Sequence, residues 1–355
     1  MEVQVPLRQE GLVAVSPGVL RLAEDIETPQ IETDEILVKV EAVALNPSDW
    51  KTIDISCTPG AVSGGDFAGI IVKIGRHVQK SFNVGDRVCS VVFGANPARP
   101  KNGAFAEYVA AVGDLCFRVP ESISPAIASS FGAGVMSVGL AFRSLGLDVS
   151  GSQNFESPGP FVLIYGGSTS TGTLAIQMLR HLGYTPITTC SPHNFALVES
   201  RGAVMAFDYK SSTCREEIRE LTGMELRYAM DCIVTSKSTT ICYGSIGRNG
   251  GKYTALESFP NRLSLRRKNV KPEWILAWSI FGKTIELGGD YRRDVRPEDR
   301  KFAVEWTKKI ESLLENGELL PHPVQVHRGG LAEIPTGLET LRNGKVSGVK
   351  YVYTI

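Results

Sequence analysis

A glycine-rich turn in the middle of the chain has the residue types and spacing of a phosphate-binding loop. Gly166, Gly167 and Gly172 follow the apolar run Phe161–Tyr165 and precede residues 174–182, whose apolar spacing is helical. The apolar run is too short for a helix and predicts a buried parallel strand. Glycines at such a turn let the backbone approach a pyrophosphate, and the first N–H groups of the helix face the anion. We therefore predict a dinucleotide site. Because the spacing departs from G-x-G-x-x-G, an ordinary strand-to-helix turn is the alternative.

The segment after a second expected strand, Thr185–Cys190, indicates which dinucleotide binds. NAD-binding units normally place an Asp or Glu there for the ribose 2′-hydroxyl. Here no carboxylate occurs before Glu199, and nothing at the strand end would repel a 2′-phosphate. The residues that could donate, stack or pair there are Ser191, His193, Asn194, Tyr209 and Lys210. We therefore predict NADPH. The alternative is a solvated helix entry with Ser191 as its cap.

Composition narrows the class of protein. The 355 residues suffice for two domains. Lys plus Arg equals Asp plus Glu, 38 each, which argues against a nucleic-acid or polybasic membrane surface and favours a small-molecule partner. Two local basic clusters, Arg262 with Arg266–Lys268 and Arg292–Arg293, are interpreted as solvated faces, with a protein-docking surface as the alternative. The seven cysteines form no C-x-x-C pair, and there is no N-terminal apolar segment and no run of about 18 apolar residues. We expect a cytoplasmic protein without a membrane-spanning helix.

The elements that must position these residues fall into three blocks. Residues 1–124 predict an all-β block, and residues 125–295 alternate strands and helices as in βαβ units. Residues 296–355, with a helix over 298–316 and strands over 320–326 and 347–355, are expected to rejoin the first block. The strands expected in the first block are Ile36–Ala44, Asp66–Ile74, Arg87–Phe93 and Ala104–Ala110.

This arrangement, together with five short motifs, resembles the medium-chain dehydrogenase/reductase family. The motifs are Ala44–Lys51 (ALNPSDWK), Gly64–Gly69 (GGDFAG), Val84–Val88 (VGDRV), Gly103–Tyr108 (GAFAEY) and the Gly166 loop. The resemblance covers nearly the whole chain. It implies an α/β fold made of a GroES-like β-barrel domain and a Rossmann domain with a doubly wound parallel sheet.

The metal ligands of zinc alcohol dehydrogenases in this family are missing. Those enzymes carry a catalytic Cys where Asn46 or Pro47 stands, and a His-Glu pair where Gly65-Asp66 stands. Their four-Cys lobe, between Cys89 and Cys116 here, is also absent. A zinc site needs three or four converging ligands, and the five histidines are interpreted as surface or polar-turn residues. We predict no metal.

Within the zinc-free branch, Leu45–Lys51 and Ser191–Asn194 look like the trans-acting enoyl reductases of fungal polyketide synthases. The resemblance implies hydride transfer from NADPH to the β-carbon of an α,β-unsaturated thioester on a carrier domain of a polyketide synthase or PKS-NRPS, then protonation at the α-carbon. Lys51 is the leading catalytic candidate, with a surface lysine after a turn as the alternative. The proton donor is left open between Tyr108, Tyr165 and solvent.

The resemblance also carries over contacts residue by residue. The nicotinamide side is expected to be lined by Pro47, Ser48, Asp49 and Trp50, and the pyrophosphate by Ser168, Thr169, Ser170 and Thr171 beside Gly166 and Gly167. The 2′-phosphate is expected at Ser191, Pro192, His193, Asn194 and Tyr209, and closure over the cofactor at Leu256, Glu257, Val346 and Ser347. Substrate is expected at Gly134, Val135, Met136, Ser137, Val138, Gly139, Leu140 and Ala141, and at Ser279, Ile280, Phe281 and Gly282. Ordinary helix packing and core are the alternatives for these last two stretches.

Two other functions remain open from the sequence. One is a free-standing NADPH quinone or enone reductase, and the other is a non-catalytic NADPH-binding protein. The segment Glu257–Trp278, where many relatives dimerise through adjoining strands, is basic and interrupted by proline. Because such an edge resists strand pairing, we expect a monomer that docks on a synthase.

Overall fold

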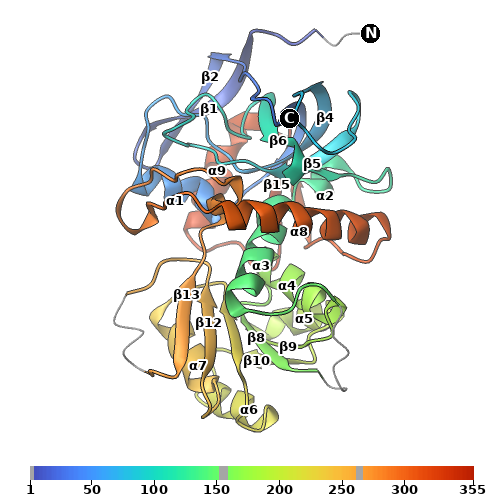
Figure 1. The fold of residues 1–355 in the computed structure, drawn as a ribbon. Coiled ribbons are helices and arrows are strands. Elements are labelled where there is room, and N and C mark those ends of the chain that lie inside the picture. Colours follow the sequence, from blue (N-terminus) through green and yellow to red (C-terminus); the bar gives the residue numbers. More distant parts are fainter. Residues whose placement is uncertain (1–3, 152–158, 261–266) are drawn as a thin grey trace. The chain divides into compact units, whose positions relative to one another are not determined.

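The chain divides into two compact units. The computed structural model describes residues 4–151, 159–260 and 267–355, so Arg262 and Arg266 lie outside the described residues. Unit 1 consists of Met1–Met136 and Trp278–Ile355, and unit 2 of Ser137–Ala277 (Figure 1). The boundaries predicted at residues 125 and 296 fall at the first residue of one helix and just before the first residue of another.

Unit 1 is built on a seven-stranded sheet and a separate two-stranded one. Its strands are β1 (Arg8–Ser16), β2 (Val19–Glu27), β3 (Glu35–Ala44), β4 (Asp66–Ile74), β5 (Arg87–Val91), β6 (Tyr108–Val112), β7 (Phe117–Arg118), β14 (Val324–His327) and β15 (Lys350–Thr354). The larger sheet has the order β14-β15-β3-β4-β5-β7, with β6 paired to β3. β15 pairs antiparallel with β3, so the end of the chain rejoins the N-terminal block.

Five predicted strands of unit 1 have different bounds. β14 covers Val324–His327 instead of 320–326, β15 covers Lys350–Thr354 instead of 347–355, and β3 begins one residue earlier than predicted. β6 begins at Tyr108 instead of Ala104, because the preceding residues contribute only a single bridge, between Ala106 and Gly11. β5 ends at Val91 instead of Phe93. Phe93 instead stacks on the ring of Trp278.

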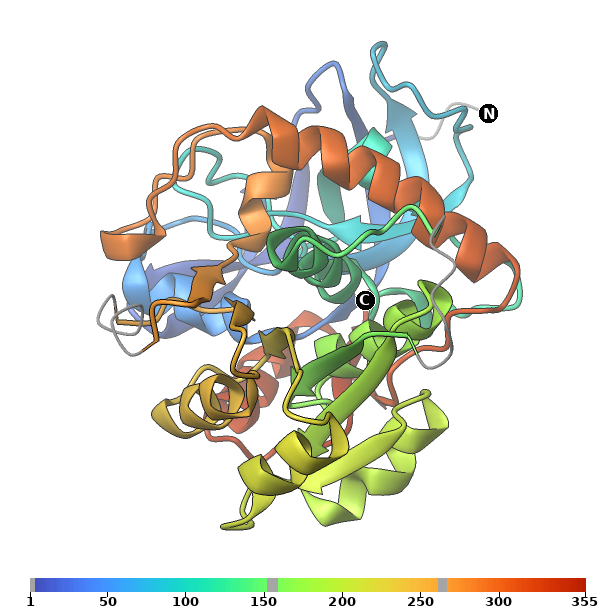
Figure 2. The same cartoon turned by 60° about the horizontal axis from the view of Figure 1, so that its bottom comes forward.

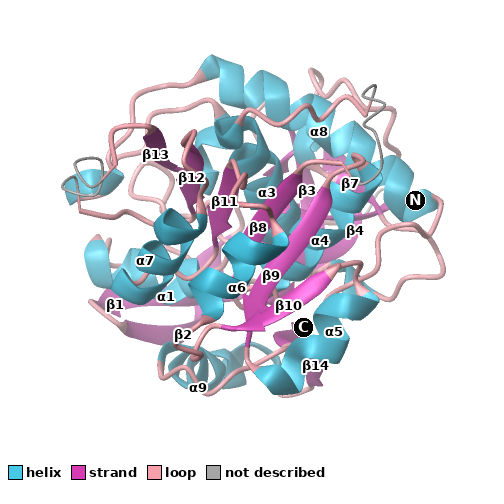
Figure 3. Cartoon of the chain, turned by 90° about the horizontal axis from the view of Figure 1, so that it is seen from below, coloured by secondary structure: helices cyan, strands magenta, loops and turns pink. Residues whose placement is uncertain are grey.

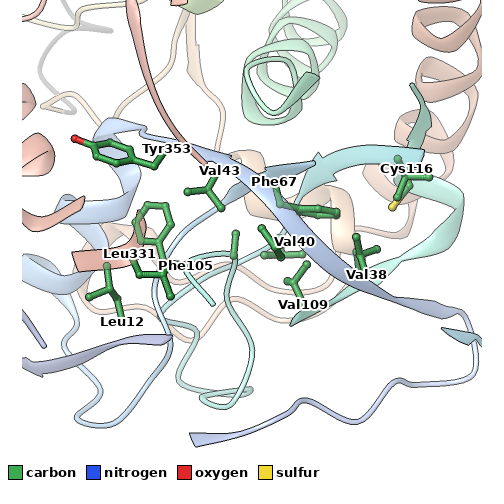
Figure 4. Packing of buried hydrophobic residues seen from close by; sticks show 14 of the residues in the cluster. Leu12, Val38, Val40, Val43, Phe67, Phe105, Val109, Cys116, Leu331 and Tyr353 are labelled. Carbon is green, nitrogen blue, oxygen red and sulfur yellow. The ribbon is translucent and has the colours of Figure 1, made fainter. Parts of the chain in front are cut away.

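The core of unit 1 draws on segments far apart in the sequence (Figure 4). Val38 and Val40 point inward from alternate positions of β3, as the two-residue period of a strand requires. A register shift between Val40 and Ala42 then moves the inward position to Val43. Phe105 and Tyr353, both almost fully buried, complete the cluster from a loop and from β15.

The helical elements of unit 1 lie around these sheets. They are α1 (Pro47–Ile55), η1 (Gly113–Leu115), α2 (Pro125–Ala128), η5 (Gly289–Tyr291), α8 (Pro297–Glu315) and α9 (Gly330–Arg342). Two further elements cross the boundary between the units, α3 (Gly132–Leu145) and η4 (Ala277–Phe281). α8 confirms the helix expected over 298–316 to within one residue, whereas α1 and α9 were not anticipated as helices.

Unit 2 is a doubly wound parallel sheet (Figures 2 and 3). Its strands are β8 (Phe161–Tyr165), β9 (Thr185–Cys190), β10 (Met205–Asp208), β11 (Tyr228–Asp231), β12 (Gly251–Ala255) and β13 (Val270–Trp274), in the order β10-β9-β8-β11-β12-β13. All neighbouring pairs are parallel. The helices are α4 (Ser170–His181), η2 (Pro192–Asn194), α5 (Phe195–Ser200), α6 (Cys214–Leu221) and α7 (Ser236–Ser245). The α/β fold class predicted from the sequence is confirmed, and β8 and β9 have the predicted bounds.

One stretch of the described chain, Pro125–Leu145, is long and apolar enough to cross a bilayer. It comprises α2 and α3, and 72% of its most apolar window is buried inside the fold. This window includes small residues such as Gly134 and Gly139, so it is apolar without containing a continuous run of large apolar side chains. The stretch therefore has the character of the core helix of a globular protein.

Candidate active site

The glycine loop of unit 2 has room for nothing but glycine at two positions. Gly166 follows β8 directly and has a φ of 84°, in the left-handed region. A Cβ at Gly167 would lie 1.9 Å from Thr188 Oγ1 on β9, and one at Gly172 would lie 2.4 Å from the Gly166 carbonyl oxygen. The absence of these side chains brings strand, turn and helix together, as a phosphate-binding turn requires.

The start of α4 presents polar groups to this loop. Thr169 is the N-cap, and its hydroxyl oxygen accepts the Gly172 N–H at 3.0 Å while donating to the Gly166 carbonyl at 2.8 Å. The buried hydroxyl oxygen of Ser170 has no hydrogen-bond partner among the described residues. Since the first N–H groups of a helix also lack partners within it, the loop fits an anion such as a pyrophosphate.

The next strand ends without a carboxylate, as the sequence indicated. Ser191 follows β9, and its hydroxyl lies 3.3 Å from that of Tyr209, just after β10. Pro192, His193 and Asn194 form the 3-10 turn η2, with the first two exposed and Asn194 buried. Ser191 occupies the N-cap position of this turn but makes no side-chain capping hydrogen bond to it.

The predicted closing residues after β12 lie at the same carboxyl edge of the sheet. The Leu256 N–H donates to the Asp231 carbonyl at 3.1 Å, and both Leu256 and Glu257 are half-buried. Unit 2 therefore collects its predicted cofactor residues at the carboxyl ends of β8, β9, β10 and β12. This edge is where open parallel sheets bind their ligands.

In unit 1, the segment Pro47–Lys51 forms the first turns of α1. Pro47, the first helical residue, is exposed, and Asp49 is buried with its Oδ2 accepting the Asn46 N–H at 2.7 Å. Ser48, Trp50 and Lys51 are half-buried. The Lys51 ammonium lies 5.7 Å from the centre of the Trp50 ring, a cation–π distance. The arrangement thus holds one acidic and one basic side chain on a single helix start.

A buried lysine beside this helix ties together four distant segments. Lys350 Nζ, on β15, donates to Asp66 Oδ2 at 2.5 Å, to Asn46 Oδ1 at 2.9 Å and to the Ser130 carbonyl at 3.4 Å. The other oxygen of Asp66 accepts the Ala133 N–H at the start of α3, at 2.6 Å. The side chains of Lys350 and Asp66 are 4% and 0% exposed, so the cost of desolvating two charges is offset by this set of hydrogen bonds. We call these residues, Asn46, Asp66 and Lys350, the lysine centre.

Asp49 borders the lysine centre, and the charges of that centre affect the pKa of its carboxyl. Burial raises the pKa of its carboxyl to about 8, and the negative charge of Asp66 acts in the same direction. The Asn46 N–H and the Lys350 ammonium oppose this rise in the pKa. A substantial fraction of Asp49 is therefore protonated at neutral pH.

The predicted segments at α1 and η4 come together around Gly65. A Cβ at Gly65 would lie 3.4 Å from Asp49 Oδ1 and 3.6 Å from the Trp278 ring. Trp278 stacks between Phe93, at 4.9 Å between ring centres, and Phe281, at 6.4 Å. The Asp49 carboxyl and the Trp278 ring thus both border Gly65, which has no side chain.

The remaining predicted residues lie in η4, in the loop before β15 and in α3. Within η4, Ser279 and Ile280 are buried, and Gly282 follows with a φ of 61°. Val346 and Ser347 lie in the loop before β15, half-buried and exposed. Residues 134–141 all belong to α3, and only Ser137 among them is half-buried, the rest being buried. Burial of this kind is also expected from helix packing alone.

Neither tyrosine considered as a proton donor is activated by its surroundings. Burial raises the pKa of the Tyr108 hydroxyl, which packs beside Leu37 and Val72. Burial also raises the pKa of Tyr165, which packs in the core of unit 2. No group of three or more His, Cys, Asp or Glu side chains arranged to hold a metal ion occurs in the described part of the chain.

Comparison with known proteins identifies the family. The sequence profile of the alcohol dehydrogenase GroES-like domain matches residues 32–121. The trans-enoyl reductase eqxC of Fusarium heterosporum is 44% identical over 353 residues, which is 99% of this chain and 100% of that protein. The chain belongs to the trans-enoyl reductases. A second such enzyme, pvhC of Talaromyces variabilis, is 44% identical over 98% of this chain and 97% of its own.

The fold of this trans-enoyl reductase is shared more widely. The crystal structure of CurK enoyl reductase superposes with a TM-score of 0.77 at 16% identity, covering 98% of this chain and 99% of that one. The resemblance drawn from the sequence is confirmed. The chain is an oxidoreductase of the medium-chain dehydrogenase/reductase family, which uses a nicotinamide cofactor.

Sequence reasoning missed the lysine centre and the Trp278 stack. Asp66 carried a signal, because it lies in the Gly64–Gly69 motif. Lys350 carried none, since a lysine in a terminal strand is ordinarily exposed. Only the fold brings Lys350 to Asp66, which lies 284 positions earlier in the chain, and to Asn46, which lies 304 positions earlier.

Proposed function

We propose that this protein reduces the α,β-double bond of an acyl thioester carried on a polyketide synthase or PKS-NRPS carrier domain, with NADPH as reductant. The observation that carries the proposal is the identity of 44% to a trans-enoyl reductase over the full length of both chains. A loop that fits a pyrophosphate supports it, because reduction needs a bound dinucleotide.

The proposed cofactor contacts follow the carboxyl edge of unit 2. Gly166, Gly167 and the segment 168–171 would hold the pyrophosphate, and Ser191–Asn194 with Tyr209 would hold the 2′-phosphate. Bound NADPH would supply the hydride that adds to the β-carbon. Pro47–Trp50, with Leu256–Glu257 and Val346–Ser347, would orient the nicotinamide end.

Lys51 is the proposed electrostatic partner of the thioester. Negative charge develops on the thioester oxygen as the hydride adds, and a fixed ammonium nearby stabilises it. Trp50 restrains the lysine, because its ring lies 5.7 Å from the ammonium. The substrate chain would run along residues 134–141 and 279–282.

The proposed partner is the synthase that carries the substrate, and the proposed setting is the cytoplasm. β13 is an edge strand of the parallel sheet and contains Pro272, which cannot donate to a further strand. Such an edge supports a monomer that docks on the synthase over a dimer joined through β13.

The proposal is tested by following oxidation of NADPH by the purified protein with crotonyl- and longer 2-enoyl-pantetheine thioesters. A simple quinone as alternative acceptor and NADH as alternative donor are run beside it. We expect thioester turnover with a preference for NADPH. Turnover of the quinone alone would place the protein among free-standing reductases, and binding of NADPH without any turnover would make it a binding protein.

The role of Lys51 has its own test. Lys51→Met should lower kcat by about 10²-fold or more while changing the KM for NADPH little, since the lost charge acts on the transition state. Lys51→Arg should recover part of kcat. Lys73→Met, at an exposed lysine of β4, is the matched control. Equal activity of Lys51→Met and this control would show that Lys51 does not stabilise the transition state.

A further inference from the structure

A second lysine near Tyr209 belongs to no predicted site. We propose that Lys237, at the start of α7, acts with Lys210 as a cationic pair on the two sides of the cofactor's 2′-phosphate, with Tyr209 between them. This inference rests on the proposed use of NADPH. It makes Lys237 a determinant of the preference for NADPH over NADH.

The geometry of the pair is centred on one aromatic ring. Lys210 Nζ lies 5.9 Å from the centre of the Tyr209 ring, and Lys237 Nζ lies 5.8 Å from it. The hydroxyl of the same tyrosine is 3.3 Å from that of Ser191, at the end of β9. Two ammonium groups and two hydroxyls are thereby gathered around one ring.

Both lysine side chains are exposed, and no carboxylate in the part of the chain that the structure describes forms an ion pair with either ammonium. Asp208, the carboxylate closest in sequence, has its Oδ1 occupied by the Lys210 N–H at 2.8 Å. Two like charges kept near each other without a counter-ion favour an anion that both can contact.

The start of α7, and so Lys237, is fixed by a buried carboxylate. Asp231 Oδ1 accepts the N–H groups of Ile233 and Val234, each at 2.9 Å, and Asp231 Oδ2 accepts the Tyr253 hydroxyl at 2.9 Å. Val234 has a φ of 59°, which a β-branched residue adopts only under constraint. The Thr235 side chain then accepts the Ser238 N–H and caps the helix. The loop therefore enters α7 along one defined path.

The position of the pair matches the ribose and not the pyrophosphate. In a doubly wound sheet the 2′-position of the adenosine ribose lies at the end of the second strand, here β9. Ser191 follows that strand directly, and its contact with Tyr209 places the ring and both lysines there. A 2′-phosphate would supply the negative charge that pairs with these two ammonium groups, whereas a 2′-hydroxyl is neutral.

The experiment measures binding of two nucleotides to the full chain by calorimetry, 2′,5′-ADP and 5′-AMP, which differ only in the 2′-phosphate. The variants are Lys237→Gln, Lys210→Gln and the double variant. Lys271→Gln, at an exposed lysine of β13, is the matched control. NADH-dependent reduction of crotonyl-pantetheine is assayed in parallel, because it reports the proposed function without a 2′-phosphate.

We expect Lys237→Gln to weaken binding of 2′,5′-ADP by about 5–20-fold and to leave 5′-AMP binding and NADH-dependent turnover unchanged. An equal loss for both nucleotides, or no loss for either, would overturn the inference. So would a wild-type protein that binds the two nucleotides equally. Each of these failures is distinguishable from failure of the proposed function, which is a lack of thioester turnover with either cofactor.

Discussion

The candidate sites of the two units are built by opposite means. In unit 2 the loop at Gly166, Gly167 and Gly172 works through backbone N–H groups and the absence of side chains. In unit 1 the lysine centre works through charged side chains, which are buried and converge from separate segments. A backbone site is specified by a short stretch of sequence, whereas a side-chain site is specified by the whole fold around it. Substitutions in the glycine loop and in the lysine centre should therefore have different effects.

The largest effect is expected where a buried charge loses its partner. Lys350→Met would leave the buried Asp66 carboxylate without its counter-charge, and we expect a loss of about 3–5 kcal/mol in the free energy of unfolding. The double variant Lys350→Met, Asp66→Asn should recover part of this loss, because no unpaired charge remains. Denaturant titration of both variants measures the difference. A single variant as stable as the wild type would show that the lysine centre holds no charge pair in solution.

The loop should respond to a single methyl group. Gly172→Ala places a Cβ 2.4 Å from the Gly166 carbonyl, so we expect a loss of about 1–3 kcal/mol together with a loss of cofactor binding. Gly288→Ala is the control, since its φ is −70° and its Cβ would meet nothing closer than 3.6 Å. Thermal unfolding and a fluorescence titration with NADPH test both parts. Normal cofactor binding by Gly172→Ala would contradict the backbone account.

The pH dependence of stability should distinguish the two units further, because burial raises the pKa of the Asp49 carboxyl in unit 1 to about 8. Between the unfolded pKa of about 4 and this value the folded state binds more protons than the unfolded state, so stability falls as pH rises. The slope from Asp49 is at most about 1.4 kcal/mol per pH unit. Asp49→Asn keeps the neutral form and should flatten the fall between pH 6 and 8. Parallel stability curves for the two proteins would show that Asp49 titrates normally.

The smallest effect is expected at the loop before α7. Tyr253→Phe removes one hydrogen bond to Asp231, and we expect a cost of about 1 kcal/mol. Its influence should extend to the cofactor, with a higher KM for NADPH and an unchanged kcat, since Lys237 would be less firmly placed. Steady-state kinetics with NADPH and NADH separate the two parameters. A change in kcat alone would argue against a positioning role for this contact.

The contrast between the units also explains what the sequence could predict. Strand β8, the glycines and Ser191 belong to one continuous strand–helix–strand segment, so local patterns predicted both their structure and their grouping. Tyr209 was also predicted, because strand order is regular in a doubly wound sheet. Lys237 was not, since its approach to Tyr209 depends on the path of the loop after Asp231. The neighbourhood of Lys350 arises only when β15 pairs with β3, and no local pattern reports that pairing.

Isotope labelling follows the proposed hydride transfer itself. The protein is incubated with NADPH deuterated at the transferable C4 position and with crotonyl-pantetheine, and the product is analysed by mass spectrometry and NMR. We expect butyryl-pantetheine carrying one deuterium at the β-carbon and a solvent-derived proton at the α-carbon. Unreduced thioester, or a product with deuterium elsewhere, would contradict the proposal.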